Sequence, residues 1–266
     1  MSSRVLAVDI GNSNIGFGLF EDGRLVLSSR IATDRKKTAD DYGVSMMGIF
    51  ALKGKSRLDL DGAVMSSVVP CVSDAVATVV ESIGGVKPLR VSADNCGLDI
   101  LVDSPGQVGT DRIANTVAAV DKYSKPVIIF DLGTATTVSV VNEEGAFIGG
   151  SIHPGVTTSL EALSSVAAQL PPIEIQSPGP VIARNTVDCM CGGIIYGTAA
   201  MLDGMAERIE EALGKTASIV VTGGLASGIV GHCKKRMIYH PDLLMEGLYL
   251  IYTLNAGKLL KDGKGE

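Results

Sequence analysis

The chain has 266 residues, of which 46% are hydrophobic and 20% are charged, and this is the composition of an ordinary globular protein. Its formal charge at pH 7 is -6 and its basic residues are scattered, which argues against direct binding to nucleic acid. The sequence has no uninterrupted apolar run of about 18 residues, and Met1–Arg4 leads directly into a strand-like segment. We therefore expect a cytoplasmic protein without a membrane span.

The cysteines and histidines predict no metal centre. Cys189 and Cys191 form a C-x-C pair instead of the C-x2-C pair of zinc sites, and the three histidines lie far apart in the sequence. We expect buried free thiols at all five cysteine positions, which are Cys71, Cys96, Cys189, Cys191 and Cys233.

The chain begins with a predicted strand, a tight turn and two further strands. Val5–Gly11 is an apolar run that ends in Asp-x-Gly, which is typical of a buried strand entering a turn. Ile15–Phe20 and Arg24–Ile31 are the next predicted strands, and Glu21–Gly23 between them predicts a hairpin turn.

A helix is predicted after the hairpin, because Thr38 and Asp41 match a capping box. The apolar residues at helical spacing, which predict the buried side of this helix, are Val44, Met47, Phe50 and Leu52. The next predicted elements are a strand and a loop over Gly62–Pro70, and helices over Val72–Ile83 and Asp111–Tyr123.

The pattern of the first hairpin recurs 122 positions later, where Val127–Gly133 is again an apolar run that ends in Asp-x-Gly. This period is too long for a solenoid and predicts two similar domains, at residues 1–118 and 119–266. The pairs that the shift aligns are Asp9 with Asp131, Gly11 with Gly133, Glu21 with Glu143, and Gly23 with Gly145.

The rest of the second half predicts helices and one further strand, so the predicted fold class is α/β, with helices layered on sheets. The predicted elements are a helix at about 158–168, a proline-rich connection over Leu170–Pro180, a helix at about 185–212, a strand over Ser218–Val221 and a helix over Pro241–Leu260.

The turn after the first strand has groups that suit phosphate. Gly11 allows a ligand to approach the backbone closely, and successive N–H groups in such a turn bind anions. Asn12 and Ser13 add short donors, and Asp9 can hold hydrated Mg2+ beside phosphates. An ordinary surface turn explains one such segment better, but two related copies favour a pair of turns that bracket a polyphosphate.

The second turn, Asp131–Thr137, carries one carboxylate and three hydroxyls, which suit a phosphate or a hard cation. A polar strand edge is the alternative interpretation. Thr222-Gly223-Gly224 after an apolar strand predicts a third loop of close approach, a weak signal by itself. The chain contains neither a P-loop nor a Rossmann fingerprint.

Gly109-Thr110-Asp111-Arg112 lies where a loop enters a predicted helix. Asp111 can orient an attacking hydroxyl and take its proton in a phosphoryl transfer, and Arg112 can bind a carboxylate or a phosphate. The simpler alternative is that Asp111 only begins the helix, a position that favours aspartate. Taken alone, the residues slightly favour this structural role.

Read in order, these motifs resemble those of the type III pantothenate kinases over about residues 4–255. The specific part of the resemblance is the combination of Gly109–Arg112 with Asp131–Thr137. The other matching segments are Asp9–Ser13, Thr38–Gly43, Ser66–Pro70, Gly149–Gly155, Asn185-Thr186 and Thr222–Ala226.

The resemblance implies two ribonuclease-H-like domains of the actin-like ATPase superfamily with a cleft between them, in a homodimer. It implies phosphorylation of pantothenate at its 4'-hydroxyl by ATP, with Mg2+ and a monovalent cation (K+ or NH4+), as the first step of coenzyme A synthesis. It makes Asp111 the catalytic proton acceptor and Asp131 the ligand of the monovalent cation. Residues implied to bind the ATP phosphates are Asp9, Ile10, Gly11, Asn12, Ser13, Asn14, Ile15, Gly16 and Thr134. Residues implied to bind pantothenate are Gly109, Thr110, Asp111, Arg112, Val102 and, across the dimer interface, Thr186.

Three positions depart from the family pattern. Val102 stands where members often carry a tyrosine, Ser139 where many carry an aspartate, and His153 in place of a small or apolar residue. These departures bear on substrate affinity and cation geometry. Two alternatives stay open: another kinase or phosphatase of the actin-like superfamily, and a non-enzymatic regulatory relative.

Overall fold

The computed structural model describes residues 3–55 and 58–262, with side chains up to residue 257. The chain divides into two compact units. Unit 1 contains the residues up to Leu98, Asp103–Ala118 and the segment from Leu243 onward, and unit 2 contains Asp99–Val102 and Ala119–Asp242.

This division differs from the predicted domains, residues 1–118 and 119–266, in two segments. The C-terminal helix packs on the sheet of unit 1, and residues 99–102 pair with a strand of unit 2. Residues 1, 2 and 263–266 of the predicted domains lie outside the described residues.

Unit 1 is built on a five-stranded sheet in the order β3-β2-β1-β4-β5. The first three strands are antiparallel, and β4 and β5 continue the sheet in parallel. The strands are β1 (Arg4–Ile10), β2 (Asn14–Glu21), β3 (Arg24–Ala32), β4 (Gly62–Ser67) and β5 (Leu89–Arg90). The predicted hairpin turn is confirmed: Asp22 and Gly23 form a two-residue turn with φ of 49° and 79°, as a type I′ turn requires.

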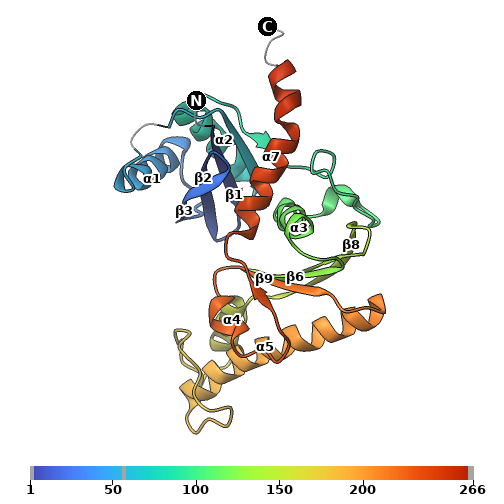
Figure 1. Ribbon diagram of the computed structural model, residues 1–266. Helices are drawn as coiled ribbons and strands as arrows, with labels where there is room; N and C mark the ends of the chain where they lie inside the picture. Colours follow the sequence, from blue (N-terminus) through green and yellow to red (C-terminus); the bar gives the residue numbers. More distant parts are fainter. Residues whose placement is uncertain (1–2, 56–57, 263–266) are drawn as a thin grey trace. The chain divides into compact units, whose positions relative to one another are not determined.

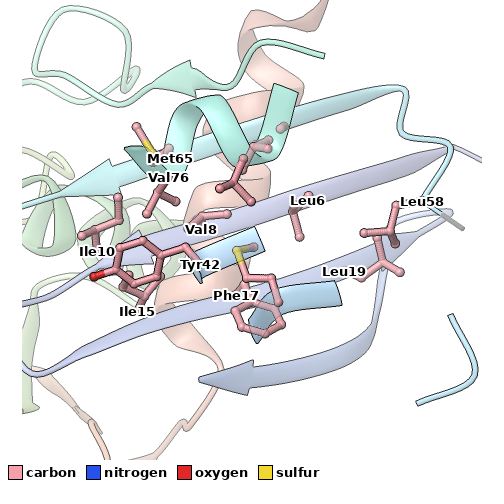
Figure 2. Packing of buried hydrophobic residues seen from close by; sticks show 14 of the residues in the cluster. Leu6, Val8, Ile10, Ile15, Phe17, Leu19, Tyr42, Leu58, Met65 and Val76 are labelled. Carbon is pink, nitrogen blue, oxygen red and sulfur yellow. The ribbon is translucent and has the colours of Figure 1, made fainter. Parts of the chain in front are cut away.

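Helices cover both faces of this sheet (Figure 1). On one face, α1 and α2 close a hydrophobic core around alternate residues of β1 and β2, among them Leu6, Val8, Ile15 and Phe17 (Figure 2). On the other face lies α7, where Gly16 and Gly18 leave room for Met245. The helical elements are α1 (Ala39–Leu52), α2 (Pro70–Gly84), η1 (Pro105–Gln107), α3 (Thr110–Lys122, in which the units divide after Ala118) and α7 (Leu243–Asp262).

The capping box of α1 is confirmed, but its predicted buried side is partly wrong. Thr38 accepts a hydrogen bond from the Asp41 N–H, and the Asp41 carboxylate accepts one from the Thr38 N–H. Val44 and Leu52, however, are 76% and 86% exposed. The residues that enter the core are Tyr42, Met46 and Phe50.

Unit 2 repeats the topology of unit 1 with the sheet order β10-β9-β6-β7-β8. Its β6, β7 and β8 are antiparallel, and β9 and β10 continue the sheet in parallel. The turn between the first two strands is one residue shorter than in unit 1, because Asp9 pairs with Gly16 whereas Asp131 pairs with Thr137. The strands are β6 (Val127–Leu132), β7 (Ala135–Val141), β8 (Phe147–Pro154), β9 (Ser218–Thr222) and β10 (Ile238–Tyr239).

The helices of unit 2 pack around Ile128, Phe130 and Leu132 on one face of this sheet. They are α4 (Val156–Val166), α5 (Thr186–Leu213) and α6 (Ser227–Val230). By length and composition alone, α5 is apolar enough to cross a membrane, and in this unit its buried face contributes Ala199, Leu202 and Ala206 to the core.

All five cysteines are free, but the expectation that all are buried is wrong. Cys71 and Cys189 lie on the surface in the first turns of α2 and α5. Cys96 and Cys191 are buried, and burial, followed by the charge of Asp203, raises the pKa of Cys233 to about 11.

Candidate active site

The turn between β1 and β2 is held in a fixed shape by its own backbone and by the residue that follows β3. The Gly11 N–H donates to the Asn14 carbonyl at 3.0 Å, and the Thr33 hydroxyl donates to the Gly11 carbonyl at 2.7 Å. A side chain on Gly11 would lie 3.1 Å from the Asn14 carbonyl oxygen, so glycine keeps this turn tight. Asn12, Ser13 and Asn14 are exposed, and the Asn12 Oδ1 accepts a hydrogen bond from Arg35 at 3.4 Å.

Two predicted ligand-binding residues of this turn face away from it. Ile10 and Ile15 are fully buried, and both side chains lie in the core of unit 1 (Figure 2). Successive side chains of a strand point to opposite faces, so Ile10 enters the core while Asp9 points to the other face. Ile10 and Ile15 can therefore offer a phosphate only their backbone groups.

Asp9 is held by the neighbouring parallel strand. Asp9 and Ser66 are opposite each other in the pairing of β1 with β4, and the Ser66 hydroxyl donates to Asp9 Oδ1 at 2.5 Å. Ser66 is fully buried. The sequence assigned this residue no role, although a pair of serines at the end of an apolar strand was a visible signal.

The start of α3 is attached to the same end of β4. The Ser67 N–H donates to Thr110 Oγ1 at 3.0 Å, and the Thr110 hydroxyl donates to the Ser67 carbonyl at 3.2 Å. Asp111 follows in the first turn of α3, where its Oδ1 accepts from the Arg112 N–H at 2.8 Å. Unit 1 therefore links Asp9 and Asp111 through two adjacent residues of β4.

Two neighbours shape the surroundings of Asp111. A Cβ on Gly109 would lie 2.5 Å from Asp111 Oδ1, so glycine leaves space for this carboxylate. Burial lowers the pKa of the Arg112 guanidinium from its ordinary value, and the charge of Asp111 acts in the opposite direction. Arg112 is thus a partly desolvated cation, a form that binds carboxylates and phosphates strongly.

In unit 2, the turn between β6 and β7 is enclosed by two glycine-containing loops. The Thr134 carbonyl accepts from the Gly155 N–H at 3.2 Å and from the Thr158 hydroxyl at 2.8 Å. A Cβ on Gly223, whose φ is 100°, would lie 2.5 Å from the Leu132 carbonyl oxygen. Gly223 therefore lets this loop pack closely against the backbone of β6, while the predicted approach of a ligand to Thr222–Gly224 stays a prediction.

The hydroxyls of this second turn do not all point the same way. Thr137 is opposite Asp131 and shares its face of the sheet, and Thr134 is exposed. Thr136 is opposite Leu132 and is only 1% exposed, so it faces the core. The turn therefore offers fewer oxygen donors than the sequence suggested.

The remaining predicted positions also lie in unit 2. Val102 belongs to the short segment that runs beside β8, where Ile100 pairs with Phe147. Thr186 is exposed at the first position of α5, next to the cap residue Asn185. His153 forms a hydrogen bond with the Ser151 hydroxyl at 2.9 Å. Among residues 3–55 and 58–262, no group of three or more His, Cys, Asp or Glu side chains could hold a metal ion.

A family model described as type III pantothenate kinase matches residues 5–208. The chain belongs to this family. It is 40% identical over 263 residues to the type III pantothenate kinase of Bacillus cytotoxicus, and the alignment covers 98% of this chain and 100% of that protein. The type III pantothenate kinase described here therefore phosphorylates pantothenate, a step of coenzyme A biosynthesis.

Solved structures confirm the fold of this pantothenate kinase. A Campylobacter jejuni protein described as a Baf family transcriptional activator has a TM-score of 0.62 at 17% identity, over 95% of this chain and 99% of that one. The inorganic polyphosphate/ATP-glucomannokinase of an Arthrobacter strain has a TM-score of 0.50 at 12% identity, over 96% and 99%. At these identities the likeness shows the actin-like ATPase fold and no more.

Proposed function

We propose that Asp9 and the Gly11–Gly16 turn bind the phosphates of ATP, and that Asp111 accepts the proton of the pantothenate 4'-hydroxyl. The observation that carries this proposal is that adjacent residues of β4 hold both groups: the Ser66 hydroxyl donates to Asp9, and the Ser67 backbone is hydrogen-bonded to Thr110. These contacts connect the strand that ends in the proposed phosphate-binding turn with the start of α3, which carries Asp111 and Arg112.

The reaction needs little covalent chemistry from the protein. The hydroxyl oxygen of pantothenate forms a bond to the γ-phosphorus, the bond from this phosphorus to the oxygen of the leaving ADP breaks, and the hydroxyl proton passes to Asp111. Arg112 binds the carboxylate of pantothenate by charge-assisted hydrogen bonds. Val102 adds an apolar contact to this substrate.

The oxygen donors of the two turns fit the cations that the family uses. Mg2+ prefers one or two carboxylates together with phosphates and water, and Asp9 offers such a carboxylate beside the exposed turn. When bound, Mg2+ neutralises charge on the transferring phosphate. Asp131, with Thr137 on the same face, offers hard oxygen donors to K+ or NH4+, and Thr134 contributes to ATP binding.

We also propose a cytoplasmic homodimer whose interface includes the start of α5. Apolar side chains are exposed at the end of α4 and shortly before the start of α5: Val166 is 85%, Val181 is 75% and Ile182 is 84% exposed. Large exposed apolar side chains are what an interaction surface would cover. Thr186 lies in the same region of the chain, which supports a role across such an interface.

The test is replacement of Asp111 by asparagine, which keeps the size of the side chain and removes the base. We expect turnover to fall by about 10²–10⁴, the usual contribution of a general base. A coupled assay of ADP release, with and without pantothenate and with K+ or Na+, measures this effect. Asp121→Asn, an exposed change on the same helix, is the matched control.

Two outcomes would count against the proposal. Full activity of Asp111→Asn would leave this residue only a structural role at the start of α3. Phosphorylation of a sugar, with none of pantothenate, would assign the same turns to a different substrate of the actin-like fold.

A further inference from the structure

The carboxyl end of β4 contacts both halves of the proposed reaction centre of unit 1. Ser66 contacts the carboxylate of Asp9, and the next residue, Ser67, contacts Thr110 at the start of α3. The two contacts are made by adjacent residues of an internal strand, which lies between β1 and β5 in the sheet.

The contact of Ser66 is fixed by the sheet itself. The parallel register pairs Asp9 with Ser66, so the backbone of β4 sets where this hydroxyl lies. Ser66 is fully buried, which protects the hydrogen bond from water. A hydrogen bond to an ionised acceptor is about twice as strong as one between neutral groups.

The contact of Ser67 uses its backbone, and its side chain is engaged elsewhere. The Ser67 hydroxyl oxygen accepts from the Val69 N–H at 3.1 Å and from the Ser73 hydroxyl at 2.7 Å. These bonds hold the start of α2 against the end of β4. The Thr110 hydroxyl therefore docks α3 on a backbone segment that is itself held in place.

We infer that Ser66 and Thr110 are positioning residues, which act through β4 to set the carboxylate of Asp9 relative to that of Asp111. This inference rests on the proposed roles of the two aspartates. Ser66 orients Asp9 toward Mg2+ and the ATP phosphates, whereas Thr110 holds Asp111 where the attacking hydroxyl arrives. Unit 2 has a related arrangement, because Asp131 is paired with Thr222 on the equivalent parallel strand.

The experiment compares Ser66→Ala and Thr110→Val, which each remove one hydroxyl. Groups that hold a metal-binding carboxylate in place typically contribute 10–100-fold to metal affinity or activity. We expect Ser66→Ala to weaken Mn2+ binding by about 10-fold, measured by electron paramagnetic resonance with a non-hydrolysable ATP analogue. Thr110→Val should lower kcat by about 10-fold and leave Mn2+ binding unchanged.

Three further variants separate positioning from a general loss of structure. Thr110→Ser keeps the hydroxyl and should restore kcat. Ser66→Cys fills the site with a somewhat larger side chain of the same shape, donates a weaker hydrogen bond and should weaken Mn2+ binding as Ser66→Ala does. Ser73→Ala removes a buried hydroxyl of the same cluster that contacts neither Asp9 nor α3, and it should change neither property even where it lowers the melting temperature.

The outcomes separate this inference from the proposed function. Wild-type Mn2+ affinity in both Ser66 variants, or wild-type kcat in Thr110→Val, would overturn the positioning roles. A wild-type enzyme that releases no ADP in response to pantothenate would overturn the proposed function, while the Mn2+ measurement would still test the contact between Ser66 and Asp9.

Discussion

Gly109 lies beside the carboxylate of Asp111, and even a methyl group at position 109 would displace this carboxylate. A Cβ there would come within 2.5 Å of Asp111 Oδ1. The neighbouring Thr110 is bonded to Ser67, so the helix start cannot easily move away. A side chain at position 109 would therefore force the Asp111 carboxylate to rotate. This rotation would move the oxygen atom that we propose accepts the proton.

We therefore expect Gly109→Ala to lower kcat/KM for pantothenate by about 10²-fold, since a misplacement of about 1 Å at a reacting group has an effect of this size. Steady-state kinetics with varied pantothenate measure the change. Gly106→Ala is the matched control, because a Cβ at Gly106 meets no atom within 4 Å. Equal kinetics in the two variants would show that Asp111 tolerates the displacement.

At the scale of residues, the sequence predicted the groups with distinctive chemistry and missed their partners. Asp9 is predicted from its residue type and its place at a strand end, whereas the catalytic role of Asp111 comes from the family resemblance, because its place at a helix start slightly favours a structural role. Ser66 was not predicted, because its contact depends on the register of two strands that are far apart in the chain. Ile15 was included with the turn, although the alternation of the strand directs it into the core.

The elements themselves follow local patterns more closely. The capping box that begins α1 and the two-residue turn at Asp22 and Gly23 are local signals, and both are confirmed. The buried side of α1 is a tertiary property, and it was predicted in part wrongly. Tyr42 is drawn inward, where its hydroxyl donates to the Asp34 carbonyl at 2.6 Å, while Val44 remains exposed.

Two hydrogen bonds to Glu210 hold the C-terminal end of α5 in place. Glu210 accepts a hydrogen bond from Lys235 at 2.6 Å and one from the Ala217 N–H at 3.0 Å. Partial burial raises the pKa of Glu210, but these two bonds outweigh it, so the pKa lies below its ordinary value of 4.5. A carboxylate of this kind stabilises the folded protein above the pKa of its unfolded form and loses this effect as the pH falls through the folded value.

Glu210→Gln should lower the free energy of unfolding at pH 7 by about 1 kcal/mol, and the difference from wild type should shrink below pH 4.5. Urea unfolding followed by circular dichroism from pH 7 to about pH 3 measures both effects. Glu211→Gln changes an exposed neighbour on the same helix and should have little effect. A difference from wild type that stays constant with pH would exclude the ion pair as its source.

For the molecule as a whole, the order of segments along the chain does not show which segments pack in the same unit. The 122-residue repeat predicts two similar domains, and the structure has two sheets of the same topology. The same argument assigned the last helix to the second domain, because it follows β9 and β10 in sequence. Only packing shows that α7 belongs to unit 1, where Gly247 lies against the backbone of Ala114 and Asn255 donates to the Asn95 carbonyl at 2.8 Å.

Removal of α7 by a stop codon after Asp242 therefore tests the organisation of the chain. Without α7, the face of the first sheet that carries Asp9 and Gly16 loses its cover, so we expect unit 1 to lose its cooperative folding. Unit 2 should keep its core, and limited proteolysis should leave a resistant fragment close to residues 119–242. A stop codon after Gly257, which keeps Tyr252 and Asn255, should leave both units folded. Loss of the second unit instead of the first would support two domains that are each continuous in sequence.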